Sequence, residues 1–141
     1  MTLTRIEVRT AGPGSHEITD LIADWLTRIG ATDGVLTAFV RHTSCSLLVQ
    51  ENADPDVQRD LLAWLDRLVP PATDPAMAFL THTIEGPDDM PAHLKAALLP
   101  VSVSIPVERG RLLLGRWQGV FLVEHRRASH RREVALAFQP L

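Results

Sequence analysis

The stretch of sequence that decides the fold is residues 101–125, VSVSIPVERGRLLLGRWQGVFLVEH. Over residues 101–107 apolar side chains alternate with serines, a pattern typical of a strand with one buried face and one wet face. Glu108-Arg109-Gly110 suits a hairpin turn, and two further strands are predicted at 111–115 and 119–125. With another strand at 133–139, the C-terminal part of the chain is predicted to be mostly strand.

Helices and further strands are predicted in the rest of the chain. Four more strands are expected at 3–10, 35–41, 46–50 and 79–83. Three helices are expected: from the N-cap Ser15 to Gly30, from Asp54-Pro55 to Pro70-Pro71, and from Asp88 to about Leu99. No regular βαβ alternation is present. The pattern therefore predicts an α+β fold, a curled, barrel-like antiparallel or mixed sheet with about three helices packed on it.

Composition limits the class of protein. The 141 residues are 45% hydrophobic and 22% charged, with no repeat or long linker, which predicts a single globular domain over 1–141. The lone Cys45, the absence of a signal-like N-terminus and the lack of an apolar run of ~20 residues predict a cytoplasmic protein. A net charge of −3 and the absence of tyrosine argue against nucleic acid or membrane partners.

Histidines, carboxylates and other polar side chains cluster in three segments, His42–Asp56, His82–His93 and Trp117–Arg132. We interpret the three segments as parts of one enzyme site. In the first segment, helix capping explains Asp54 and Asp56 but leaves Glu51 and Asn52 unexplained. The second places histidines and carboxylates in the pattern of a divalent-cation site, although its spacing is not diagnostic.

The third segment contains Glu124, which shares a strand face with Val120 and Leu122 and so points toward apolar side chains. A carboxylate there must be paired or bind a ligand, and Arg126 or Arg111 is the partner expected in a purely structural interpretation. Seven arginines between 109 and 132 could bind anions, or they could form a solvated face that balances the acidic segments.

These residues resemble a known family. His42-Thr43-Ser44, Glu51 to Asp56, Asp88 to Lys95, Gly110-Arg111-Leu112, Trp117-Gln118-Gly119 and Glu124-His125-Arg126 are similar, in this order, to motifs of the YjbQ-like family. The resemblance runs from about Thr4 to Phe138. It implies a curled-sheet α+β fold, a homotrimer and a site near subunit contacts. The site residues that it implies are His42, Glu51, Asn52, Asp54, His82, Glu85, Asp89, His93, Gln118 and Glu124.

Many members of that family are named secondary thiamine-phosphate synthase. The resemblance therefore implies joining of a pyrimidine diphosphate to a thiazole phosphate with release of pyrophosphate, a reaction that needs a divalent metal and cations for the leaving group. The histidines favour zinc or manganese, and the carboxylates also suit magnesium. The alternative is a ligand-binding or regulatory trimer with a structural metal at subunit contacts.

From residue chemistry and resemblance together we assign roles. The metal ligands are predicted to be His42, His82 and His93, with Glu124 or Glu85 as a fourth ligand or general base and Asp89 and Asn52 as further catalytic residues. Arg126, Arg116, Gln118 and Glu51 are predicted to bind substrate or anion. Cys45 is a weaker candidate for a nucleophile and is expected to be packed. The sequence assigns no role to His130.

Overall fold

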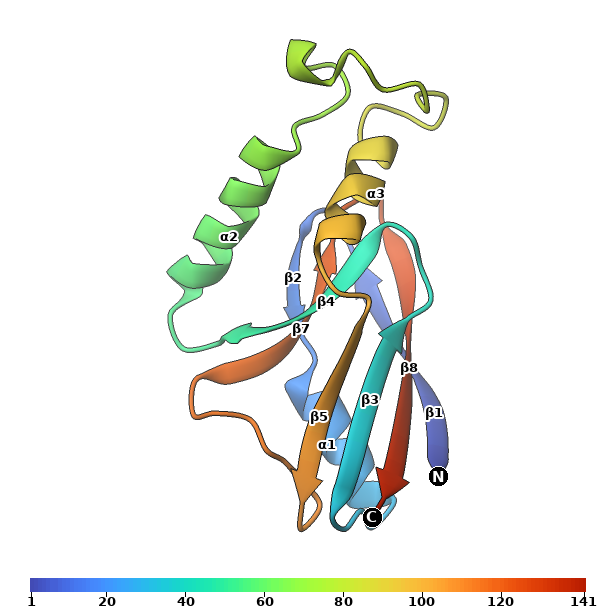
Figure 1. The fold of residues 1–141 in the computed structure, drawn as a ribbon, viewed down its shortest axis with the longest axis vertical. Coiled ribbons are helices and arrows are strands. Elements are labelled where there is room, and N and C mark those ends of the chain that lie inside the picture. The colour runs from blue at the N-terminus through green and yellow to red at the C-terminus, as the bar shows by residue number, and fades with distance from the viewer.

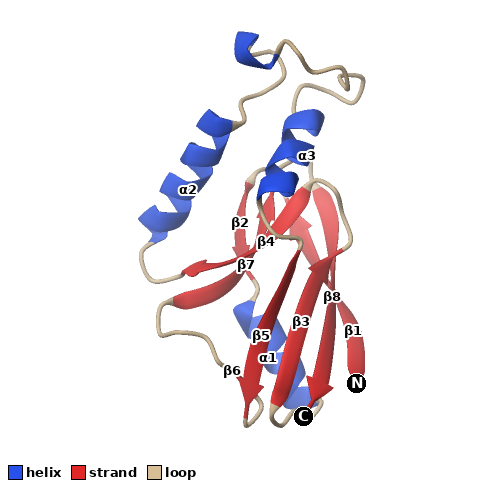
Figure 2. Ribbon diagram, viewed as in Figure 1, coloured by secondary structure: helices blue, strands red, loops and turns tan.

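The computed structural model describes all residues 1–141, and its strands form two antiparallel sheets (Figures 1 and 2). The larger has the order β1-β8-β3-β5-β6 and the smaller the order β2-β7-β4. The strands are β1 (Thr2–Thr10), β2 (Gly14–Glu17), β3 (Gly34–Val40), β4 (Cys45–Glu51), β5 (Ser102–Glu108), β6 (Arg111–Leu112), β7 (Gln118–Glu124) and β8 (His130–Pro140). The helices are α1 (Thr19–Arg28), α2 (Pro55–Leu68) and α3 (Asp89–Leu98), with a short 3-10 helix η1 (Pro75–Met77).

One hydrophobic core lies between the sheets and α1. Inward side chains alternate along β3 and β8, as in Leu36 and Leu136, and meet Leu122 of β7 and Leu26 of α1. The result is a strongly curled antiparallel half-barrel that carries three helices, which confirms the predicted α+β class. No helix is both long enough and apolar enough to cross a membrane.

The hairpin predicted from residues 101–125 forms as expected. Glu108 pairs with Arg111 across a two-residue loop in which Arg109 has φ 50° and Gly110 φ 77°. Two successive positive φ angles define a type I′ turn, whose twist matches that of the flanking strands. The serines of β5 are exposed and Ile105 and Val107 are buried, so the wet face is also confirmed.

Two predicted elements are wrong. Residues 79–83 form no strand and lie in the irregular connection from α2 to α3. Ser15 does not cap α1, because residues 14–17 form β2, in which Ser15 pairs with Val123. The helix begins at Thr19, whose hydroxyl accepts a hydrogen bond from the Val120 amide. The observed eight strands match the expected number only because β2 replaces the predicted strand at 79–83. The strand predicted at 111–115 is also shortened to Arg111–Leu112.

Helix α2 begins where predicted, with the Asp54 side chain accepting the Asp56 amide at 2.9 Å and Pro55 as its first residue. Figure 1 shows this helix standing away from the sheets. Only Leu65 of its apolar stripe is buried, whereas Trp64 and Leu68 are more than half exposed. Most of the apolar stripe of α2 is therefore at least partly exposed.

Candidate functional site

Asp89, in the first turn of α3, is the centre of the second polar segment. It is 2% exposed, its Oδ2 lies 2.7 Å from Nε2 of His82, and its Oδ1 lies 2.5 Å from Nη1 of Arg126. Burial raises the pKa of this carboxyl, but the hydrogen bond with His82 and the nearby His93 and Arg126 outweigh burial and hold the pKa below its ordinary value. Asp89 is therefore a buried carboxylate that stays ionised at neutral pH.

Glu85 completes a compact donor set with His82 and Asp89. One ligand atom from each residue lies within 4.8 Å of the others. His82 and Glu85 come from the irregular α2–α3 connection, which turns sharply at Gly86 (φ 99°), whereas Asp89 comes from the helix. One imidazole nitrogen and two carboxylates suit zinc, manganese or magnesium. The donor types and their separations suit a divalent cation, which would take the place of the hydrogen bond between His82 Nε2 and Asp89 Oδ2.

Arg126 joins this set to the end of β7. Its Nε donates to Asp88 Oδ2 at 3.0 Å, its Nη1 donates to Asp89, and its Nη2 lies 3.4 Å from the carbonyl oxygen of Glu85. Two ion pairs therefore engage the guanidinium that the sequence predicted as an anion clamp. In this arrangement Arg126 positions the carboxylates of the donor set.

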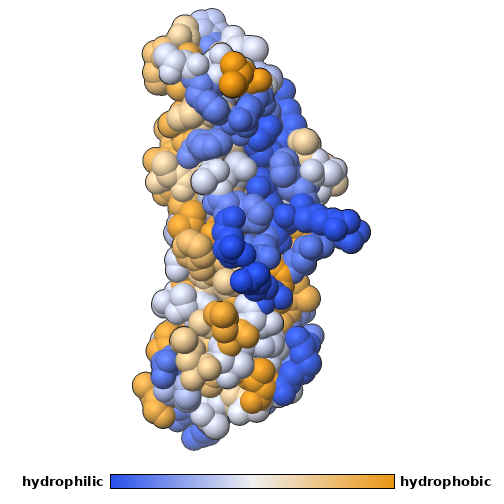
Figure 3. All heavy atoms as spheres, turned by 90° about the vertical axis from the view of Figure 1, so that its right-hand side faces the viewer, coloured by the Kyte–Doolittle hydropathy of each residue, from blue (hydrophilic) through white to orange (hydrophobic).

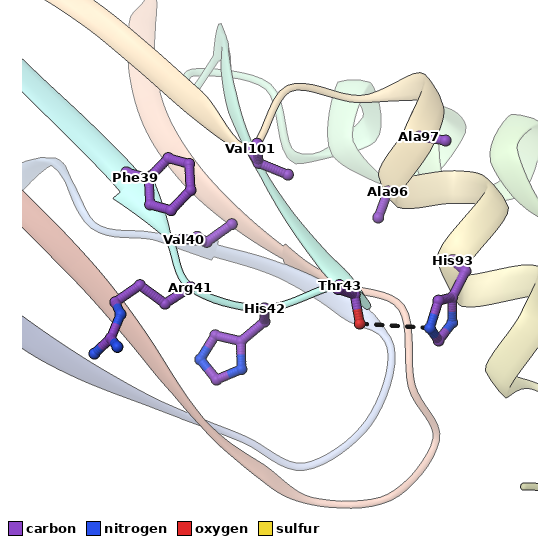
Figure 4. A pocket seen from close by; sticks show the side chains of 9 residues that line it. All are labelled: Phe39, Val40, Arg41, His42, Thr43, His93, Ala96, Ala97 and Val101. Atoms are coloured by element: carbon purple, nitrogen blue, oxygen red, sulfur yellow. Dashed lines mark hydrogen bonds between the residues drawn. The ribbon is translucent and has the colours of Figure 1, made fainter.

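His93 lies beside the donor set and also lines a cleft of about 540 Å³ between the end of β3 and α3 (Figure 4). Its ring centroid is 5.7 Å from that of His82, and its Nδ1 is 2.7 Å from the Asp89 carbonyl oxygen. That carbonyl can only accept, so Nδ1 carries the proton. In the neutral ring Nε2 is then an acceptor, 3.4 Å from the hydroxyl of Thr43. His93 thus presents a basic nitrogen beside the cleft.

His42 lines the same cleft, but its ring lies on the other side of Thr43 from His93 (Figure 4). Its Nε2 accepts the amide of Glu133 at 2.8 Å. Burial and, to a smaller extent, Arg132 lower the pKa of His42, which keeps the ring neutral. Of the three predicted histidines, only His82 belongs to a group of donors close enough to share one ion, so within one chain they do not form a single ligand set.

Glu124 is buried, as its position among apolar residues predicted, but its partner differs from the expected one. Its carboxylate accepts two hydrogen bonds from Arg132, at 2.7 and 2.5 Å, and one from Thr10 at 2.6 Å. The amides of His125 and Arg126 complete its shell. Neither Arg111 nor Arg126 is the neutralising cation. Both carboxylate oxygens are engaged, so neither is free for a cation in this arrangement.

The remaining predicted residues form a second group at the far end of β4 and β7. Glu51 pairs with Gln118 across the two strands, six residues from the Cys45–Glu124 pair, which is roughly 20 Å away at ~3.3 Å per residue. Asn52 donates to Glu17 at 3.0 Å, and Arg116 stacks on the exposed Trp117. One chain therefore brings the three polar segments together as two separate groups.

Sequence reasoning did not single out Arg132, although the sequence contained a signal. Arg132 is in phase with Val134, Leu136 and Phe138, whose side chains all point into the core. An arginine on that face needs a buried acid as a partner. Lys95 and His125 are two further buried polar residues to which the sequence motifs gave no role.

The fold has been seen before in solved structures. A crystal structure of the protein APE1520 from Aeropyrum pernix matches over the whole of both chains, with a TM-score of 0.88 at 27% identity. The structure of TT1486 from Thermus thermophilus covers 96% of this chain and 99% of its own, with a TM-score of 0.83 at 40% identity. The chain is thus one of a class of small α+β proteins built on this curled sheet.

The particular family follows from sequence. Residues 4–140 match the family model described as UPF0047 protein YjbQ-like. The protein sll1880 of Synechocystis is 47% identical over 127 residues, which cover 90% of this chain and 84% of that protein. YjbQ of Salmonella typhimurium is 41% identical, covering 89% and 88%. The chain belongs to the UPF0047 YjbQ-like family, as its motifs predicted.

Proposed function

We propose that this protein is a metal-assisted enzyme that acts on a phosphorylated metabolite. The observation that carries the proposal is the donor set of His82, Glu85 and Asp89 beside the cleft that His93 lines. A buried, ionised carboxylate paired with an imidazole is costly to assemble, and such groups concentrate at functional sites. A divalent ion held there would offset negative charge on phosphoryl oxygens.

The reaction we propose is that of a secondary thiamine-phosphate synthase, in which a pyrimidine diphosphate and a thiazole phosphate combine and pyrophosphate leaves. The cleft of about 540 Å³ is large enough for a small heterocyclic substrate. Its lining is mainly apolar, with Phe39 and Val101 available to pack on rings. Nε2 of His93 would accept or return a proton, and Arg126 would keep Asp89 oriented.

We further propose that the working protein is a homotrimer with sites shared between copies. Glu51, Asn52 and Gln118 lie too far from Asp89 to reach the same small substrate within one chain. The outer face of the larger sheet supports association, since Val35 and Phe39 are partly exposed there beside small residues. In Figure 3 apolar residues run along the left margin, which is the side facing the viewer in Figure 1.

Metal binding and turnover test this proposal directly. After chelator treatment, titration with Zn²⁺, Mn²⁺ and Mg²⁺ is expected to show one site per chain, which His82→Ala and Asp89→Asn abolish. Asp74→Asn is the matched control, because Asp74 caps η1 in the same connection and takes no part in the donor set. Metal-dependent release of pyrophosphate from the two substrates is expected. A wild-type protein that binds none of these ions overturns the proposal.

Mixed assemblies test whether sites are shared. His82→Ala and Glu51→Gln proteins, each inactive alone, are expected to recover part of the activity when they are unfolded and refolded together. Recovery requires that the two residues come from different copies in one site. Light scattering would establish the assembly. A protein that is active as a monomer excludes the shared site.

The alternative is a ligand-binding trimer in which the metal is structural. One observation favours it, namely that Asp89 already forms an ion pair with Arg126 and a hydrogen bond with His82 without any ion. In that case His82→Ala would dissociate the trimer, and no turnover would be found with either metal or substrate.

A further inference from the structure

A polar hollow lies beneath α2, outside the cleft and the donor set. Two adjoining cavities, of about 190 and 130 Å³, share Pro13, Asp66, Lys95 and His125 in their linings. The larger also reaches Asp88 and Arg127. Because Asp88 is bound to Arg126, the hollow adjoins the candidate cation site but does not include its donors.

Lys95 brings a buried positive charge to this hollow. Its side chain is 11% exposed, and the ammonium donates to Asp66 Oδ1 at 2.5 Å. An ammonium has three N–H donors, and Asp66 accepts only one of them. The Asp66 side chain is 68% exposed, since it projects from α2. Lys95 is therefore a buried cation whose partner, the Asp66 carboxylate, can move away into solvent.

His125 supplies a second donor. The residue is 5% exposed, its Nε2 lies 2.9 Å from the buried hydroxyl of Ser46, and its Nδ1 has no hydrogen-bond partner. The only side-chain polar atom sealed without a partner is Oε1 of Gln58, so Nδ1 opens into the hollow. In the tautomer in which the Ser46 hydroxyl donates to Nε2, Nδ1 carries the proton of the neutral ring and can donate a hydrogen bond to a ligand in the hollow; we assign this tautomer to His125.

Arg127 supplies a third donor at the edge of the hollow. Its backbone amide donates to Asp88 at 2.9 Å, while its guanidinium takes part in none of the ion pairs of the structure. The three acids of the lining are already engaged, Asp88 by Arg126, Asp66 by Lys95 and, in the smaller cavity, Glu124 by Arg132. The unused hydrogen-bonding capacity of the hollow is thus on the donor side, which selects an anion with several acceptor oxygens.

We propose that this hollow binds a phosphate group through Lys95, His125 and Arg127, and that Asp66 occupies Lys95 until phosphate displaces it. A cavity of about 190 Å³ admits one phosphate with its bound water but not a nucleotide. Whether the phosphate is free or belongs to the substrate rests on the proposed function, whereas its binding does not.

The test is a calorimetric titration of the chelator-treated protein with inorganic phosphate at pH 7.5, with no metal present. Arg127→Gln and Lys95→Met are expected to weaken binding about tenfold each, the usual effect of losing a charged hydrogen bond. Asp66→Asn is expected to strengthen binding several-fold, because the competing carboxylate is gone. Arg131→Gln, an exposed arginine outside the hollow, is the matched control and should bind as the wild type does.

Asp66→Asn is expected to strengthen phosphate binding and Arg127→Gln to weaken it. The test therefore does not depend on whether the Lys95→Met variant folds. The proposal is overturned if phosphate does not bind, if Asp66→Asn weakens binding as much as Arg127→Gln does, or if Asp89→Asn rather than Arg127→Gln abolishes it. If the protein binds phosphate but none of the metal ions, the assignment of the phosphate site is supported and the proposed metal-assisted function is overturned.

A second arm identifies the source of the phosphate. If the hollow belongs to the substrate site, inorganic phosphate competes with thiazole phosphate and Arg127→Gln raises the KM for that substrate about tenfold. If the hollow binds free phosphate only, inorganic phosphate and thiazole phosphate bind at the same time, and Arg127→Gln leaves the KM for thiazole phosphate unchanged. Either result supports Lys95, His125 and Arg127 as the phosphate-binding residues.

Discussion

Arg132 and Glu124 form a two-point ion pair inside the protein, with Nε 2.7 Å from Oε1 and Nη2 2.5 Å from Oε2. Both residues are at most 3% exposed. Burial raises the pKa of Glu124, but the hydrogen bonds from Arg132 and Thr10 outweigh burial and lower it. The same carboxylate accepts the Arg126 amide, so the ion pair also fixes the residue that holds Asp89 in place.

Replacing one member of this pair should be costly. Glu124→Gln leaves the Arg132 charge buried without a counter-charge, and we expect the free energy of unfolding to fall by about 3–5 kcal/mol. Urea denaturation followed by tryptophan fluorescence measures the change. The double variant Glu124→Gln/Arg132→Met should recover part of the loss, and a single variant as stable as the wild type would contradict the burial of the pair.

His125 should make stability depend on pH. Burial, followed by the charge of Lys95, lowers its pKa to about 4, against an ordinary value of 6.5. Above pH 6.5 the ring is neutral in both states and its contribution to stability is complete. As the pH falls from 6.5 to 4, His125 becomes protonated in the unfolded chain but stays neutral in the folded protein. The free energy of unfolding therefore falls by about 3 kcal/mol in total.

Two measurements separate His125 from other groups. Denaturation at a series of pH values should show the loss, and His125→Phe should reduce its slope between pH 6.5 and 4. A slope remains, because burial also lowers the pKa of His42. An NMR titration that finds the His125 ring protonated at pH 6 would rule out the buried neutral form.

Gly119 is expected to tolerate no side chain without rearrangement. A Cβ at this position would lie 2.4 Å from Oε2 of Glu17 and 3.1 Å from Cβ of Asn52. Glu17 is held there by hydrogen bonds from Thr19 and Asn52. The exposed Glu17 carboxylate can swing away only by losing those hydrogen bonds, so Gly119→Ala should lower the free energy of unfolding by about 1 kcal/mol. In a double-mutant cycle, Glu17→Ala should remove part of that cost, whereas strictly additive effects would show that the contact is absent.

Cys45 should be unreactive in the folded protein. The thiol is fully buried, and burial raises its pKa to about 11, so very little thiolate exists at pH 8. We expect a disulfide reagent to label native Cys45 at least ~100-fold more slowly than the unfolded chain. Rapid labelling of the native protein would reopen the possibility of a cysteine nucleophile.

Local sequence signals predicted much of the fold. The hairpin at Arg109–Gly110 and the start of α2 at Asp54-Pro55 depend on backbone conformations and caps that neighbouring residues determine. The strand predicted at 79–83 and the Ser15 cap failed because distant pairing decides those segments. β2 exists only because β7, more than 100 residues later, supplies its partner strand.

The sequence predicted which segments form the candidate site better than it predicted which side chains contact one another. Asp89 and His82 were named from one segment, and they meet because a short loop joins them to α3. The partner of Glu124 was not predicted, because Arg132 comes back to it only after a turn of the chain. Nor could the sequence reveal that the Glu51 end of β4 lies far from Asp89, since that distance depends on strand direction.

Strand β1 is an edge strand of the larger sheet, paired with β8 on one side and with no strand on the other. Its free amides and carbonyls are a template on which a strand from another molecule could add. Every second residue from Arg5 to Arg9 is charged and exposed, and Arg5 also lies 3.8 Å from Glu133 of β8. These charges disfavour the approach of an apolar strand, which is one of the ways in which edge strands resist aggregation.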